Sequence, residues 1–265
     1  MASESLSPAS QFFDFSVINV RIDEAVGIIT ERIRCGEYAP VYFINAHCVN
    51  VAQRDLGYAA SLRSNRVNFA DGIGVAIAAW SFGNPLVDNV NGTDLFPPLC
   101  QALAADRAKV FLLGAQPGVA ETLAQRMVEN HPGLQIVGTQ HGHFEDHESE
   151  GIADRIRLSN ADVVFVAMGV PRQEHWIERY GSSTGAKVVL AVGGLFNFYS
   201  GKIPRAPRWM LRMRMEWVHR LYQEPRRMWR RYLVGNVEFL GRLAWVVAKK
   251  RRNRVVATAL SSNAK

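Results

Sequence analysis

The sequence predicts an α/β protein with a doubly wound, mostly parallel sheet, followed by a small, basic, helical appendage. Short apolar runs recur through residues 1–200, and amphipathic stretches separate them. This alternation of strand and helix is typical of parallel strands joined by crossover helices, as in Rossmann-like folds. The sign of the charge changes near residue 201. We therefore expect an α/β domain at 1–200 and an appendage at 201–265.

The predicted strands are rich in β-branched and aromatic residues and end near Gly, Asn or Asp, as buried parallel strands do. They lie at 41–45, 67–70, 110–113, 134–137, 163–167 and 188–192. The predicted helices lie between them at 23–34, 92–105, 117–129, 148–159 and 172–180. Ligands of such sheets bind at the carboxyl ends of the strands, so the residues after each strand are the first candidates for a site.

The predicted appendage carries most of the positive charge. Residues 202–254 contain 16 lysines and arginines but only three acids. Residues 1–201 contain 14 lysines and arginines and 21 acids. Its arginines stand beside tryptophans, which suits an anionic, partly apolar surface such as a layer of lipid headgroups. The guanidinium fork also suits phosphate. The alternative is a solvated basic face over ordinary core aromatics.

Two features predict helices in the appendage. Trp209, Met213, Trp217 and Leu221 recur every four residues, which predicts one helical stripe. Pro225 predicts the start of a second helix, because proline is favoured in a first helical turn.

The termini and the cysteines restrict the compartment. The first ten residues are polar and lack the pattern of a signal peptide, and no apolar run approaches the roughly 20 residues that span a bilayer. Three scattered cysteines show neither a metal spacing nor a disulfide framework, which fits a reducing compartment. We therefore expect a cytoplasmic protein that binds the inner face of the cell membrane peripherally.

Asp71 is the strongest candidate for a catalytic residue. It stands between an apolar strand and the apolar stretch that begins at Ile73, with Gly72 beside it. A carboxylate in this position can be partly desolvated and can act as a general base. It could equally cap the following helix, whose exposed amides favour an anion, and the two roles are compatible.

The other candidates after the strands are less specific. Asn45 could bind a ligand or complete a turn, and Gln173 could bind a ligand or be an ordinary first-turn residue. His141, His143 and His147 resemble a metal cluster, but a glycine places them in a predicted loop, so we expect no metal. The glycine-containing turn after residue 113 lacks the dinucleotide fingerprint, so we expect no cofactor.

Several segments, in order from about residue 15 to 240, resemble the WecG/TagA/CpsF glycosyltransferases of bacterial surface-polysaccharide synthesis. Each segment alone is a weak signal, but together they are specific. They are Asn45–Asn50, Ala70–Gly74, Asn91–Asp94, Phe111–Gly114, Gly169–Glu174, Gly193–Phe198, Arg205–Pro207, Glu216–Leu221 and Glu224–Arg227.

The resemblance implies a reaction and its partners. Members of this family transfer a sugar from a UDP donor, with inversion and without a metal, to a sugar on a polyprenyl diphosphate at the cytoplasmic membrane face. It implies a hexose-type donor such as glucose, N-acetylmannosamine or its uronic acid, and it leaves the acceptor sugar and the linkage open. The expected partners are these two substrates and anionic inner-leaflet lipids, with no nucleic acid and a possible homo-oligomer.

The resemblance also assigns roles to residues. The proposed base of the family falls on Asp71, and its donor-pocket asparagine and glutamine fall on Asn45 and Gln173. Arginines of its appendage, thought to bind the diphosphate and close the site, fall on Arg220, Arg227 and Arg230.

The sequence departs from the family pattern at three positions. Phe43 replaces a threonine found in some members, Asn197 replaces a common aspartate, and His143 replaces an aromatic. These differences concern acceptor contacts and the choice of sugar, not the class of reaction.

Two other classes of function compete with a transferase. A nucleotide-dependent oxidoreductase could share the fold, although the dinucleotide fingerprint is missing. A non-enzymatic binder of anionic lipid or nucleic acid could use the appendage, and nucleic-acid binding would depend steeply on salt.

Overall fold

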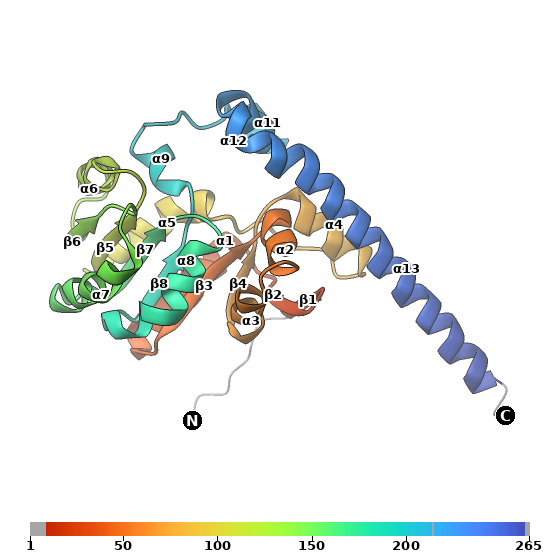
Figure 1. Ribbon diagram of the computed structural model, residues 1–265. Coiled ribbons are helices and arrows are strands. Elements are labelled where there is room, and N and C mark those ends of the chain that lie inside the picture. The colour runs from red at the N-terminus through yellow and green to blue at the C-terminus, as the bar shows by residue number, and fades with distance from the viewer. Residues whose placement is uncertain (1–8, 214, 263–265) are drawn as a thin grey trace.

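The computed structural model describes residues 9–213 and 215–262, which form an eight-stranded sheet with helices on both faces (Figure 1). The strand order is β1-β2-β4-β3-β8-β7-β5-β6, and every neighbouring pair is parallel except β1 with β2. The strands are β1 (Ala9–Phe12), β2 (Phe15–Ile18), β3 (Ala39–Ile44), β4 (Val67–Ala70), β5 (Lys109–Gly114), β6 (Gln135–Gln140), β7 (Val163–Ala167) and β8 (Val188–Ala191). The predicted mostly parallel, Rossmann-like sheet is confirmed.

The first two strands were not predicted. They form a tight antiparallel hairpin that extends the sheet, because Ile18 of β2 pairs in parallel with Phe69 of β4. Phe15 and Val17 of β2 are buried, whereas Ser16 between them is exposed. Such alternation of buried and exposed residues is typical of a strand with one covered face. Because β2 has only four residues, the alternation is too short to predict the strand from the sequence.

The helices of the α/β body lie in the predicted intervals and in several others. The predicted ones are α1 (Ile22–Cys35), α5 (Gly92–Ala105), α6 (Val119–Asn130), α7 (Ser149–Leu158) and α8 (Arg172–Trp176), which continues as a π-helical turn over Ile177–Gly181. The additional ones are α2 (Ala46–Ala52), α3 (Leu56–Ser64), α4 (Ile73–Ser81) and α9 (Leu195–Tyr199). Helix α6 begins two residues later than predicted, after Gly118 in the left-handed conformation (φ 83°).

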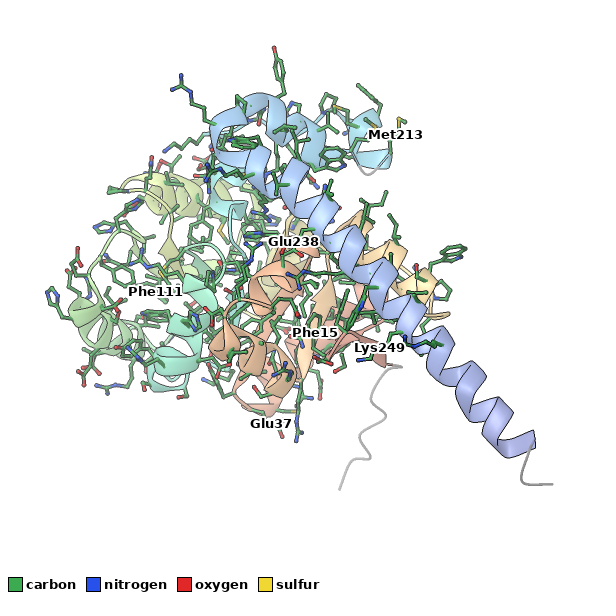
Figure 2. All side chains as sticks on the ribbon, turned by 45° about the vertical axis from the view of Figure 1, so that its right-hand side comes forward. Phe15, Glu37, Phe111, Met213, Glu238 and Lys249 are labelled. Carbon is green, nitrogen blue, oxygen red and sulfur yellow. The ribbon has the colours of Figure 1, made fainter. Side chains whose placement is uncertain are left out.

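The basic helical appendage is confirmed, but the single predicted stripe is wrong. Helix α10 (Arg208–Arg212) ends before Met213, and α11 (Glu216–Gln223) starts a new segment, so the four stripe residues do not share one helix. Pro225 opens α12 (Pro225–Trp229), as predicted. A π-helical turn (Arg230–Val234) leads into α13 (Gly235–Ser262), a long helix that packs along α2 and α4 (Figures 1 and 2).

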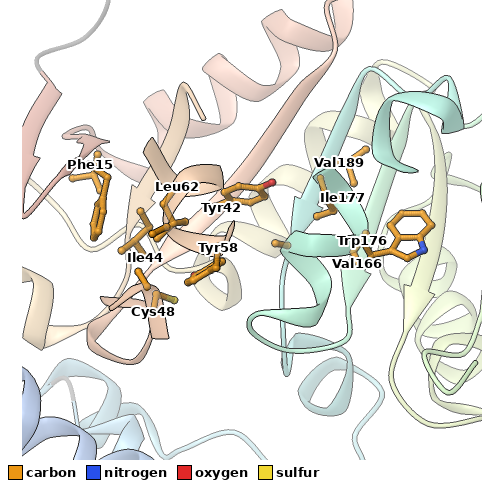
Figure 3. Close-up of a cluster of buried hydrophobic side chains, with 14 of the residues drawn as sticks. Phe15, Tyr42, Ile44, Cys48, Tyr58, Leu62, Val166, Trp176, Ile177 and Val189 are labelled. Atoms are coloured by element: carbon orange, nitrogen blue, oxygen red, sulfur yellow. The ribbon is translucent and has the colours of Figure 1, made fainter. Parts of the chain in front are cut away.

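Two apolar clusters hold the layers together, one on each face of the sheet. Neighbouring residues of β3 show the division: Val41 belongs to the cluster under α1, α5 and α6, and Tyr42 belongs to the cluster under α2, α3 and α8. Figure 3 shows the second cluster, with Tyr58 of α3 and Trp176 of α8. Helix α13 joins it through Phe239 and Leu243, which are almost fully buried. The appendage is therefore anchored in the core of the body.

None of the helices in the described residues is long and apolar enough to cross a membrane.

Candidate active site

A cavity of about 710 Å³ opens at the carboxyl ends of the parallel strands, where the sequence predicted a site. This volume is in the range of sites that enclose a small molecule. One wall comes from the loops after β3, β4, β5, β7 and β8, and the other comes from α11, α12 and the π-helical turn of the appendage. Among the predicted residues, Asp71, Asn45, Gln173, Arg220 and Arg227 line it.

Asp71 and Asn45 form a pair on the body wall. Asn45 Nδ2 donates a hydrogen bond to Asp71 Oδ2 (3.1 Å), and the Cys48 amide donates to Asn45 Oδ1 (3.2 Å). Asn45 therefore caps α2 and holds Asp71 at the same time, so the turn role that the sequence left open is present, and its role toward a ligand stays a prediction. The Asp71 amide donates to Ile44 O (2.9 Å), which ties the ends of β3 and β4 together.

Asp71 does not cap the helix that follows it. The N-cap of α4 is Gly72, and no side chain caps that end. Gly72 adopts a positive φ of 89°, and its amide donates to Asn89 Oδ1 (2.6 Å), so the chain turns sharply and leaves the carboxylate facing the cavity. Burial raises the pKa of Asp71, while the Asn45 hydrogen bond and the charges of Arg231 and Arg220 oppose the increase. A carboxylate with a raised pKa is a stronger base.

Gln173 joins two strand ends. Its Oε1 accepts hydrogen bonds from the amides of Gly169 (3.1 Å) and Gly193 (3.0 Å), in the loops after β7 and β8. Its Nε2 donates to Glu174 Oε1 (2.9 Å). Gln173 reaches the cavity wall, but its amide oxygen is already used by the backbone, so it shapes the pocket.

Glu174 lies behind this wall and was not predicted to matter. It is 2% exposed, and burial raises its pKa to about 7. Its Oε2 has no hydrogen-bond partner among the described residues. Its Oε1 accepts the hydrogen bond from Gln173 Nε2, so Glu174 helps to orient the Gln173 amide.

Glycines bring the loops after β5 and β6 close together. A Cβ at Gly114 would lie 2.5 Å from Ala167 O, and a Cβ at Gly142 would lie 3.0 Å from Gly114 Cα. Arg172 holds this corner by donating to the carbonyls of Gly142 (2.9 Å) and Phe144 (2.7 Å). Close backbone contact therefore forms this end of the pocket.

The arginines of the appendage do not all reach the cavity. Arg220 packs directly on Gly194, where a Cβ would lie 2.5 Å from its guanidinium, and it stands over the Phe198 ring (4.7 Å). Arg227 lines the cavity and pairs with Glu224 (2.9 Å). Arg230 is exposed, lies over Trp229 (5.2 Å) and is not among the lining residues.

Arg231 lines the cavity where Arg230 was expected. Its Nε is buried without a partner among the described residues, and its charge acts on both Asp71 and His47. Arg231 follows Arg227 by four residues, so the two lie on the same side of the helical segment, whereas Arg230 lies on a neighbouring side. This spacing from Arg227 is the sequence signal that could have identified Arg231.

Three charged residues connect the appendage to the body. Arg205 contacts Asp94, in the first turn of α5, and its Nε lies 3.8 Å from Glu216 Oε1 at the start of α11. Burial raises the pKa of Glu216. This cluster fixes one end of the appendage beside the cavity mouth.

Two histidines and the positions that depart from the family pattern also lie at the cavity. Burial and the nearby Arg231 and Arg54 lower the pKa of His47 to about 4, so it is neutral at pH 7. The His143 ring lies 3.2 Å from Ala115 O. Phe43 and Asn197 line the cavity. No three His, Cys, Asp or Glu side chains of the described residues are grouped to hold a metal ion.

Comparison with known proteins identifies the family. The model of the glycosyl transferase WecG/TagA/CpsF family matches residues 10–254. Among similar proteins, the N-acetylglucosaminyldiphosphoundecaprenol N-acetyl-beta-D-mannosaminyltransferase of Bacillus spizizenii is 36% identical over 182 residues, covering 69% of this chain and 70% of its own. Proteins of the same name from Bacillus subtilis and Staphylococcus aureus are 31% and 29% identical, covering 82% and 78% of this chain and 81% and 79% of their own. The chain therefore belongs to the WecG/TagA/CpsF family of glycosyltransferases.

Proposed function

We propose that this protein is an inverting, metal-independent glycosyltransferase that moves a hexose-type sugar from a UDP donor to a sugar on a polyprenyl diphosphate. The observation that carries the proposal is a carboxylate with a raised pKa, held by an amide, in a cavity whose other wall is rich in arginine. The names of the relatives specify a mannosaminyl group and an undecaprenol-diphosphate acceptor, which favours N-acetylmannosamine as the donor sugar.

The proposed reaction is a single displacement. Asp71 accepts the proton of the acceptor hydroxyl while that oxygen forms a bond to the anomeric carbon. The bond from this carbon to the UDP oxygen breaks, and UDP leaves with the bonding electrons. Attack on the face opposite the leaving group inverts the anomeric configuration.

The leaving diphosphate develops negative charge, which Arg220, Arg227 and Arg231 can stabilise from the appendage wall. Guanidinium groups bind phosphate oxygens in pairs, and fixed positive charge in a cavity is more effective than in water. Arg230 directly precedes Arg231 in the sequence but is exposed and does not line the cavity. We therefore place Arg230 at the rim of the cavity, away from the diphosphate.

The basic appendage suits a peripheral position on the inner face of the cell membrane, where a lipid-linked acceptor resides. It brings the arginines and the membrane contact together in one part of the chain, so binding to anionic lipid and closure of the cavity can be coupled. We propose that residues from about 201 onward act as this membrane-associating lid.

The test is UDP release from a panel of UDP-sugars, with and without a short-chain polyprenyl-diphosphate-linked N-acetylglucosamine in detergent. We expect acceptor-dependent release with one donor, undiminished by EDTA. Release that requires added Mg²⁺ or Mn²⁺ would contradict metal independence. No release with any donor, under conditions where the protein is folded, would contradict the transfer itself.

A further inference from the structure

Helix α4 of the α/β body carries an apolar stripe that nothing in the described chain covers. Ile73, Ile77 and Trp80 recur at the spacing of one helical face, and they are 43%, 40% and 74% exposed. The stripe begins at the site: Asp71 is two residues before Ile73, and Ile73 lines the cavity. It therefore runs from the cavity mouth outward over the surface of the body.

Helix α13 continues this surface. Its inner face is buried through Phe239 and Leu243, yet apolar side chains also lie on its exposed sides, since Val237, Leu240 and Trp245 are exposed. The two helices pack side by side, because a Cβ at Gly74 of α4 would lie 3.4 Å from the Phe239 ring (Figures 1 and 2). A helix with apolar residues on both sides needs a second apolar surface besides the core.

The charges beside these stripes are positive. Lys249 Nζ lies 5.0 Å from the centre of the Trp245 ring, and Lys250 Nζ lies 5.2 Å from the ring of Phe82, which follows α4 directly. The acid nearest in sequence on α13, Glu238, is already paired with Arg54 and Arg242 (2.6 and 2.7 Å). Tryptophan and lysine around an apolar stripe are typical of a surface that lies at the headgroup level of a bilayer.

We propose that α4, together with the outer face of α13, is a membrane-docking surface of the α/β body that inserts Ile77 and Trp80 among anionic lipids. The inference rests on the proposed function, because an acceptor on a lipid must enter a cavity whose mouth lies at the bilayer. It extends that function by assigning membrane contact to the helix that starts beside Asp71, in addition to the basic appendage.

A lipid surface accounts for this face better than a second copy of the chain does. A symmetric pair would bring the same unpaired lysines to both sides of its interface, where no free acid of these helices is available to meet them. An anionic headgroup layer neutralises these lysines and covers the apolar stripes at the same time.

The test compares two double variants of the full chain. Ile77→Ser with Trp80→Ser removes the two stripe residues of α4 that do not line the cavity and leaves Ile73, which lines it, unchanged. Leu56→Ser with Leu158→Ser is the matched control, because these leucines are 78% and 71% exposed on α3 and α7. Sedimentation with vesicles of phosphatidylethanolamine and phosphatidylglycerol measures binding, and circular dichroism verifies folding.

We expect the α4 variant to bind these vesicles about tenfold more weakly than the wild type, and the control variant to bind like the wild type. Trp80→Phe gives an independent readout: quenching of tryptophan fluorescence by brominated lipids should fall relative to the wild type. Equal vesicle binding by the α4 variant and the wild type would overturn the proposal. So would a smaller mass in light scattering with unchanged vesicle binding, since the occupant would then be a second copy.

Transfer to a short-chain acceptor in detergent separates this inference from the proposed function. The α4 variant should keep wild-type transfer in detergent and lose it on vesicles that carry a long-chain acceptor. If the wild type transferred no sugar and the α4 variant still lost vesicle binding, the proposed function would be refuted and the docking surface would stand. Wild-type transfer and wild-type vesicle binding in the α4 variant would refute the docking surface alone.

Discussion

The two walls of the cavity are built in different ways. On the body wall, Asn45 and Gln173 use their polar atoms within the protein and hold Asp71 and the strand ends in place. On the appendage wall, Arg227 is largely exposed, and Arg231 Nε has no partner among the described residues. The comparison teaches that Asp71, the proposed base, is held in place by the protein itself, whereas the appendage wall keeps positive charge that a ligand could bind.

The largest expected effect is at the body wall. Replacing Asp71 with Asn should lower kcat by about 10³-fold or more, because the amide cannot accept the proton of the acceptor hydroxyl. The thermal midpoint should change little, since Asn retains the shape of the side chain. Steady-state UDP release measures the effect, with Asp154→Asn on the surface of α7 as the control. Wild-type kcat in the Asp71 variant would remove it as the base.

The next effect separates two adjacent arginines of the appendage wall. Arg231→Gln should lower kcat/KM about 10²-fold, because it removes a charge from the cavity, whereas Arg230→Gln should change it by less than about threefold. Both variants alter the net charge equally, so non-specific electrostatics cannot explain a difference. A larger loss in Arg230→Gln than in Arg231→Gln would show that Arg230, and not Arg231, acts in the cavity.

A third prediction concerns the stability of the body wall. The pKa of Glu174 is raised to about 7 from the ordinary 4.5, so the folded state binds more protons than the unfolded state between these values. The free energy of unfolding contributed by this group is therefore lost as pH rises from about 4.5 to 7. Glu174→Gln should raise stability at pH 8 by about 2–3 kcal/mol and have little effect at pH 4.

Urea unfolding at the two pH values measures this difference. Glu178→Gln is the control, because Glu178 also belongs to this part of the chain and accepts a hydrogen bond from Tyr42 (3.1 Å). A Glu174 variant that is less stable than the wild type at pH 8 would show that the charged carboxylate stabilises the loop.

The smallest effect is a displacement of the pH profile. The Asn45 hydrogen bond lowers the pKa of Asp71, against the larger effect of burial. Asn45→Ala should therefore move the acid limb of kcat/KM to higher pH, while Glu174→Gln should leave that limb in place. A limb at the ordinary carboxyl value of 3.8, unmoved by Asn45→Ala, would show that Asp71 is not desolvated.

The sheet and much of the site could be predicted from the sequence. Runs such as 163–167 are apolar throughout, because both faces of a central parallel strand are covered. The strand order follows from crossover connections only in part, and the hairpin before α1 is too short to give a clear period. Asp71 and Asn45 were found because each directly follows a strand, where ligands of such sheets bind.

The parts that sequence could not predict depend on tertiary context. The one-helix stripe through Trp209 and Trp217 fails because α10 ends at Arg212 and α11 begins at Glu216, although the apolar spacing continues. Arg230 was assigned through the resemblance to the family, whereas Arg231, four residues after Arg227, is the arginine of this pair that lines the cavity. Glu174 was not singled out from the sequence, because its burial depends on the packing of α3 against α8.

Asn45 has a consequence for how this chain tolerates mutation. Its oxygen accepts from the Cys48 amide and its nitrogen donates to Asp71, so one side chain needs both an acceptor and a donor at fixed positions. Aspartate keeps the acceptor but sets a second negative charge against Asp71, and serine is too short to reach both partners. In a library that samples every amino acid at this position, we expect asparagine alone to retain full activity.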